Sequence, residues 1–233
     1  MRKIVIMLFA ILLLNACKTA NNISPEYVGK KIPGKKLGIY LRNQNITCKD
    51  EIESLGEGDP KRVYKEFFES YLSKCLINNG NFSSVDFLTK SDLSDLNQKT
   101  LETGDFEAIT MDIPNSGSVF KTDSIYYDVV LIIEDLKVEK IDVVNYNNNV
   151  NLTNNFGLGS NDQDRIETSM KYLYWDNEGK TIIGYGKEMF KMGLGIGVAS
   201  GASKEHWNNS LRQLSYKMLL DTPFYNIPEG VLM

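Results

Sequence analysis

Cys17 is the side chain whose neighbours point most directly to a chemical reaction. It follows the long apolar run Ile4 to Leu14, eleven residues that come after Arg2 and Lys3. Positive charge, a short apolar run and then small residues are typical of an export signal. As a helix, eleven residues reach about 16 Å, whereas the hydrocarbon core of a bilayer is about 30 Å thick, so we expect no membrane span here.

Residues Leu14, Asn15, Ala16 and Cys17 resemble the lipobox of bacterial lipoproteins, in which a branched apolar residue and two mostly small residues precede a cysteine. Asn15 is a less usual occupant of its position. The resemblance implies that residues 1–16 are a lipoprotein signal peptide, and that Cys17 becomes an acylated first residue carrying diacylglycerol and a further chain such as palmitate. Several acyl chains anchor stably, whereas one binds a membrane marginally. The alternative is a plain secretory signal that happens to contain a cysteine.

Cys48 and Cys75 are the other two cysteines, an even pair once Cys17 is set aside. In an oxidising compartment they could form a disulfide, which by chain entropy would stabilise the fold by roughly 3 kcal/mol. Against this, Cys75 lies on the apolar stripe of an expected helix, where a buried free thiol behaves as a small hydrophobic side chain. Both readings stay open at the level of sequence.

Catalytic and metal-binding patterns are hard to build from the remaining residues. His206 is the single histidine, so we predict no histidine metal cluster and no serine triad, and expect His206 to lie at the surface or to cap a helix. Acidic residues are plentiful, which leaves a hydrolase that uses carboxylates alone as an alternative. We predict no catalytic residue, cofactor or metal site.

Two glycine-containing stretches imitate nucleotide-binding motifs. Gly29 to Lys36 has the glycine and lysine spacing of a phosphate loop, but it precedes a strand, contains Pro33 and has Lys36 where Ser or Thr is needed. Gly193 to Gly201 lacks the strand-turn-helix spacing of a dinucleotide site. We interpret the second stretch as a flexible connector.

Charge divides the chain into unequal parts. Loss of residues 1–16 would remove Arg2 and Lys3 and take the formal net charge from -4 to -6, which argues against nucleic-acid binding. Residues 17–36 carry five lysines against Glu26 alone. We predict that they form a basic tether, a solvated spacer that could also contact anionic lipid head groups.

Residues 37–233 are predicted to form a single α/β (α+β) envelope domain, a mixed sheet of about five strands packed by two main helices. Asp59 and Pro60 open the clearest helix, which Gly80 ends. Ser91 is expected to cap a short helix around Leu93 and Leu96. The other expected strands and helix are 37–41, 85–88, 125–141, the hairpin 166–175 with 180–190, and a helix after Ser203.

Asn145 to Asn155 contains seven asparagines in eleven residues and is expected to be a mobile loop or hairpin tip. The resulting order is strand, helix, strand, short helix, strand, hairpin, helix. This order, with "NNGNFSSVDFLTKSDLSDL", "YDVVLIIEDL" and "KYLYWDNEGKTIIGYG", resembles a group of bacterial envelope proteins. The group includes the lipoprotein activators of penicillin-binding proteins, the amino-terminal domain of the Tol-Pal propeller protein and the curli secretion channel subunit.

The resemblance implies a non-catalytic lipoprotein of the cell envelope, anchored in the outer membrane through Cys17 and binding a protein partner in the periplasm. The second hypothesis is a subunit of a secretion pore, in which residues 138–172 and 184–204 would supply membrane hairpins. Asn145 to Asn155 offers no apolar band for lipid, which disfavours the pore. Function inferred from fold likeness is associational in both cases.

Overall fold

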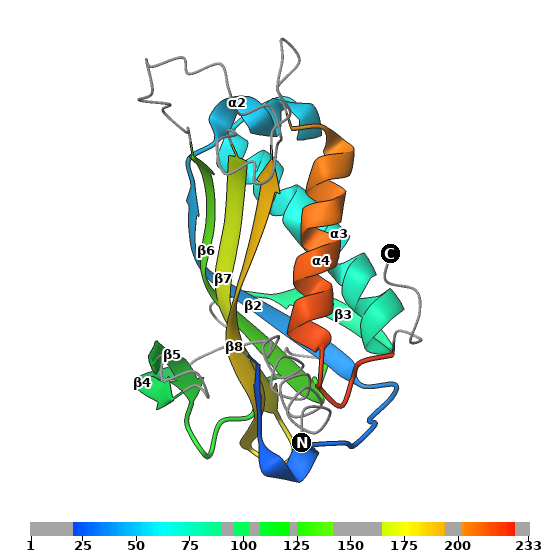
Figure 1. The fold of residues 1–233 in the computed structure, drawn as a ribbon. Helices are drawn as coiled ribbons and strands as arrows, with labels where there is room; N and C mark the ends of the chain where they lie inside the picture. The colour runs from blue at the N-terminus through cyan, green and yellow to red at the C-terminus, as the bar shows by residue number, and fades with distance from the viewer. Residues whose placement is uncertain are drawn as a thin grey trace, which may run out of the picture.

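A six-stranded mixed sheet forms the body of the protein (Figure 1). The computed structural model describes residues 21–89, 96–102, 108–121, 125–141, 165–193 and 202–226. The strands of this sheet are β1 (Asn22–Ile23), β2 (Lys36–Ile46), β3 (Ser84–Leu88), β6 (Val129–Ile141), β7 (Arg165–Asp176) and β8 (Thr181–Gly193). Their spatial order is β1-β8-β7-β6-β2-β3. The pairs β2–β3 and β2–β6 are parallel, and the pairs β6–β7, β7–β8 and β8–β1 are antiparallel.

Two long helices cover one face of the sheet. They are α3 (Pro60–Gly80) and α4 (Lys204–Leu219), which lie side by side in Figure 1. Shorter helical pieces are the 3-10 helix η1 (Pro25–Tyr27), the helix α2 (Lys49–Ile52) and the 3-10 helix η2 (Glu53–Leu55). The buried side chains between the helices and the sheet include Leu37, Ile39, Phe68, Leu72, Leu131, Ile133, Tyr172, Tyr174, Trp207 and Leu211. No helix in the described ranges is long and apolar enough to cross a membrane.

The caps of the long helices follow from the sequence. The Asp59 carboxylate accepts a hydrogen bond from the backbone N–H of Arg62 at 2.9 Å, and Pro60 occupies the first turn of α3. Past Gly80, Asn81 takes the left-handed conformation at φ 52°. At α4, Ser203 and His206 form a capping box, which confirms the capping role expected of both residues.

A hairpin covers the opposite face of the sheet. Its strands are β4 (Leu96–Glu102) and β5 (Ala108–Pro114), which pair antiparallel as a separate two-stranded sheet. The apolar side chains beneath it include Tyr40, Ile109, Met111, Ile113, Phe120, Tyr127, Val130, Ile132, Leu173 and Trp175. Because β6 alternates its side chains between this cluster and the helical core, Val129 to Ile133 are all buried. That is the central strand with two covered faces that the sequence predicts.

The predicted fold class is confirmed, a mixed sheet with two main helices and the expected β7–β8 hairpin. Five pieces were not expected: the two-residue β1, the short helical pieces η1, α2 and η2, and the β4–β5 hairpin. The predicted short helix around Leu93 and Leu96 is wrong at its end, because Leu96 begins β4 and pairs with Pro114. Ser91, Leu93 and the asparagine-rich stretch 145–155 lie outside the described residues.

The predicted tether 17–36 is also wrong from Asn21 onward. β1 adds to the edge of β8, Tyr27 is buried, and the amide N–H of Ile32 donates to the Pro223 carbonyl at 2.9 Å. The physical reason is that Ile23, Tyr27 and Ile32 bury apolar surface against the core, which outweighs the polar composition around them. The folded domain therefore begins at residue 21 or earlier, not at residue 37.

Candidate functional site

A network of ion pairs lies between the β4–β5 hairpin and the main sheet. The Arg42 guanidinium on β2 contacts the carboxylates of Asp112 on β5 and Glu134 on β6, the latter at 3.4 Å. Glu134 also accepts the backbone N–H of Asp112 at 3.0 Å. Three strands are thus joined around one guanidinium, whose planar array of donors suits two carboxylates at once.

A second contact to the hairpin runs through a bulge in β6. The register of β6 against β7 shifts between Glu134 and Lys137, and Asp135 takes φ 52° there. The Lys171 ammonium lies 2.8 Å from the Asp135 carboxylate and 3.1 Å from the Thr110 carbonyl of β5. The hydrogen bond from Lys171 lowers the pKa of Asp135 below its usual value, which favours the ionised carboxylate.

Glu134 is the buried member of this network. Burial raises the pKa of its carboxyl, and the neighbouring Arg42 acts in the opposite direction. Both of the Glu134 contacts that fasten the hairpin use the carboxylate oxygen Oε1. The network therefore attaches the hairpin to the sheet through ion pairs and hydrogen bonds. Each of its carboxylates contacts a cationic side chain or a backbone amide.

The outer surface of the hairpin is polar and open to solvent. Four consecutive residues of β4 are exposed: Asn97, Gln98, Lys99 and Thr100. The strand pairs with β5 along one of its two edges. No strand in the described part of the chain pairs with the other edge of β4. An unpaired edge presents backbone N–H and C=O groups to which an extended segment of another protein can add.

The residues singled out from the sequence lie in different places. Leu14, Asn15, Ala16 and Cys17 are outside the described residues. Cys48 and Cys75 are both buried and free. Cys48 lies near Tyr64, since their charges interact, and Cys75 is eleven residues further along α3, about 16 Å along a helix axis.

Both thiols are free in this structure, so no disulfide joins Cys48 to Cys75 here. Burial, with a smaller contribution from Glu51, raises the pKa of Cys48 to about 12. Burial also raises the pKa of Cys75. Burial and a raised pKa both disfavour the thiolate, which is the form of cysteine that reacts as a nucleophile.

The structure describes only parts of the segments that the metal-site and pore hypotheses concern. Within the described ranges, no three His, Cys, Asp or Glu side chains gather as a metal site. Of the pore segments, 138–141 and 165–172 pair in the main sheet as parts of β6 and β7, and 184–193 pairs with β7 as part of β8. Lys204 begins α4. The intervening residues 142–164 and 194–201 lie outside the described part.

Sequence reasoning missed Arg42, Asp112 and Lys171, since single charges in polar context give no pattern. The hairpin itself left a signal in the alternation of Ile109, Met111 and Ile113 with more polar neighbours, which is the two-residue period of a half-buried strand.

No protein-family model matches the chain, and no curated protein matches it. Among solved structures, the chain is similar to the PelC dodecamer of Paraburkholderia phytofirmans, at 9% identity and a TM-score of 0.38, over 89% of this chain and 99% of that one. It is similar to a DUF330 family protein of Xanthomonas campestris at 7% identity and a TM-score of 0.38, over 85% and 87% of the two chains. A homologue of the neuraminyllactose-binding hemagglutinin from Helicobacter pylori matches at 12% identity and a TM-score of 0.31, over 82% and 83%.

Proposed function

We propose that the chain is a lipid-anchored bacterial envelope protein whose domain binds a protein partner and catalyses no reaction. The lipobox-like residues Leu14 to Cys17 support the anchor. An acylated Cys17 would hold the domain in the outer membrane, facing the periplasm.

The observation that carries the binding function is the β4–β5 hairpin. It is fastened rigidly to the sheet through Arg42 and Lys171, yet the exposed strand β4 has an edge that no described strand covers. A rigid support and an open strand edge suit the addition of an extended partner segment, because backbone hydrogen bonds supply the affinity.

The anchor is tested by Cys17→Ser. We expect the variant to remain unprocessed or to leave the membrane fraction, since it has no thiol to acylate. Cys48→Ser is the matched control, because it removes a buried thiol and leaves the anchor intact. A Cys17→Ser protein that fractionates and migrates like the parent would show that the lipoprotein interpretation is wrong.

The binding surface is tested by photo-crosslinking in native envelopes. A crosslinking residue at Gln98, on exposed β4, is expected to capture a reproducible protein partner. The same residue at Lys65, on the exposed surface of α3, is the control. Equal capture at both positions, or none at Gln98, would count against binding through β4.

A further inference from the structure

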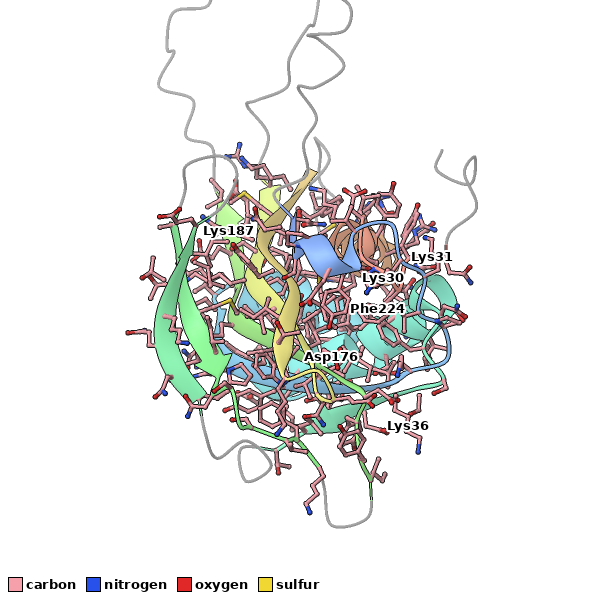
Figure 2. All side chains as sticks on the ribbon, turned by 90° about the horizontal axis from the view of Figure 1, so that it is seen from below. Lys30, Lys31, Lys36, Asp176, Lys187 and Phe224 are labelled. Atoms are coloured by element: carbon pink, nitrogen blue, oxygen red, sulfur yellow. The ribbon has the colours of Figure 1, made fainter. Side chains whose placement is uncertain are left out.

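The lower end of the domain in Figure 1 gathers four segments that are far apart in the sequence. We use "lower end" for η1 with residues 28–36, the β7–β8 turn 176–180, and the segments 115–121 and 125–128. The Tyr27 hydroxyl donates to Asp176 at 2.6 Å, and the Asn177 side chain bonds to the backbone of Phe120 and Tyr127. These bonds hold the segments together as one surface, which Figure 2 shows from below.

Exposed apolar side chains concentrate on this lower end. Of the six large hydrophobic side chains that are exposed in the described residues, four lie here: Val28 at 64%, Val119 at 43%, Ile125 at 38% and Tyr126 at 44%. Val28 is the most exposed, and it stands beside Gly29, whose φ of 72° turns the chain away from the core. Exposed apolar groups with a charged surround mark a contact surface.

The segments of the lower end also carry exposed basic side chains. Lys30, Lys31 and Lys36 are exposed and lie at the lower end in Figure 2. The Lys30 ammonium lies 5.4 Å from the centre of the Tyr27 ring, and the Lys31 ammonium donates to the Tyr225 carbonyl at 2.7 Å. Each contact fixes the stem of a lysine and leaves further donors on its ammonium for another acceptor.

Carboxylates at the lower end are fewer than the ammonium groups. Six lysines (30, 31, 35, 36, 121 and 180) stand against four carboxylates (26, 128, 176 and 178). Asp128 is engaged by Lys35 at 3.5 Å and by the Lys36 N–H at 2.8 Å, and Asp176 accepts Tyr27 and two amides of its turn. The lower end is thus net positive on a chain whose formal charge is -4.

The opposite end of the molecule has the reverse charge. α2, η2 and the start of α3 lie at the top of Figure 1, and residues 49–62 contain five carboxylates against the three cationic residues Lys49, Lys61 and Arg62. Lys140 pairs with one of them, Glu51, at 3.0 Å. An anionic surface would attract the lower end and repel this upper end, so it would orient the molecule.

The first packed residue restricts which surface can meet a membrane. The Asn21 amide donates to the carbonyls of Lys217 and Leu220, at 2.6 and 3.1 Å, and accepts a bond from the Tyr172 hydroxyl. Asn21 is four positions after Cys17, and a fully extended chain over four positions spans at most about 14 Å. An acylated Cys17 would therefore keep Asn21, and with it the carboxyl-terminal turn of α4, close to the lipid.

We propose that the lower end of the domain lies on an anionic lipid bilayer, with Val28 among the head groups and Lys30 and Lys31 on lipid phosphates. This inference rests on the proposed anchor at Cys17. Each lysine near an anionic surface contributes about a fivefold change in binding. The acyl chains hold the protein at the bilayer, and the lower end determines the orientation of the domain relative to the bilayer.

The test measures which surface touches lipid. Acylated protein is purified and placed in vesicles of phosphatidylglycerol and phosphatidylethanolamine that contain brominated acyl chains, which quench nearby tryptophan. Trp175 and Trp207 are buried, at 3% and 0% exposure, so the parent gives a protected background. Val28→Trp adds a reporter on the lower end, and Lys61→Trp adds one at the exposed start of α3, at the opposite end of the molecule.

We expect bromine to quench the added fluorescence of Val28→Trp and to leave that of Lys61→Trp unquenched. In the Val28→Trp protein, changing both Lys30 and Lys31 to Gln is expected to lower the ratio of docked to undocked molecules about 25-fold. Changing Lys65 and Lys74, exposed on α3, to Gln is the matched control and is expected to have no effect.

Mass measurement of the peptide that contains Cys17 separates the two proposals. A peptide without acyl groups would overturn the anchor and the proposed function. An acylated protein with equal or no quenching at positions 28 and 61 would overturn the docking surface alone. Equal quenching in phosphatidylcholine vesicles would overturn the role of the two lysines.

Discussion

Glu188 is a residue whose charge opposes folding. Its side chain on β8 is buried at 6% exposure, its Oε2 lies 3.7 Å from the Lys217 ammonium, and its Oε1 has no hydrogen-bond partner among the described residues. Burial raises the pKa of the carboxyl, and Lys217 offsets only part of that rise. The folded protein therefore binds the proton of the Glu188 carboxyl more tightly than the unfolded chain does. This proton binding stabilises the fold at low pH, and the stabilisation is lost as pH rises through the pKa of Glu188 in the folded protein.

Glu188→Gln removes this ionisation and keeps the shape of the side chain. We expect the variant to be more stable than the parent by about 1 kcal/mol at neutral pH, with a flatter dependence on pH above about 4, because no carboxylate is left to desolvate. Urea unfolding across that pH range measures the effect. Glu205→Gln, in the exposed first turn of α4, is the control. A variant less stable than the parent at neutral pH would show that the Lys217 pairing dominates.

Asn177 joins the β7–β8 turn to the segment before β6 by side-chain bonds. It is fully buried, accepts the Phe120 N–H at 2.8 Å, and donates to the Phe120 and Tyr127 carbonyls at 2.8 and 2.7 Å. Asn177→Ala removes three buried hydrogen bonds to the backbone, so we expect a loss of about 2–4 kcal/mol in the free energy of unfolding. Glu178→Ala, in the same turn and exposed, is expected to change it by under about 0.5 kcal/mol. Denaturant unfolding compares the two.

At the scale of elements, the hairpin depends on one fully buried side chain. Met111 of β5 lies at 0% exposure among Tyr40, Val130 and Leu173. Met111→Ala leaves a cavity and is expected to cost about 2–5 kcal/mol, felt most strongly as detachment of β4 and β5. Limited proteolysis that cuts within 96–114 before any other region would report it. Thr110→Ala, whose hydroxyl meets Thr100 in solvent, should leave the cutting pattern unchanged.

Elements with strong local signals were predictable from the sequence. Asp59 with Pro60, the apolar run of β6, and the Asp176 to Gly179 turn each specify a local conformation without help from the rest of the fold. The hairpin was not predicted because β4 is polar almost throughout, so its strand form depends on pairing with β5 rather than on its own composition.

The amino-terminal segment was missed for the opposite reason. Its lysines, Gly29 and Pro33 indicate a solvated linker, and only the tertiary fold supplies the surfaces that bury Tyr27 and Ile32. Long-range contacts of this kind are invisible to local patterns. The ion pairs of Arg42 are invisible for the same reason, because they join residues that are 70 and 92 positions apart.

At the scale of the molecule, the two ends of the chain stabilise each other. Asn21 and the last turn of α4 are joined by side-chain bonds, so Asn21→Ala is expected to cost about 1–3 kcal/mol and to expose residues 21–24 to protease. Asn226→Ala keeps the backbone bond to Asn79 and is expected to behave like the parent. Unfolding curves with early cleavage sites read by mass spectrometry measure both. Unchanged cleavage in Asn21→Ala would contradict the dependence on α4.

The pairing of β1 with β8 also determines when, during folding, the amino-terminal residues of the domain can find their partners. Asn22 pairs with Tyr185, and Asn21 needs the carbonyls of Lys217 and Leu220, so the start of the domain finds its partners only when almost the whole chain has been delivered. Contacts of such sequence separation form late. Until then residues 17–20 are joined to an unfolded segment. Acylation at Cys17, as proposed above, would therefore precede the pairing of residues 21–23 with the rest of the domain.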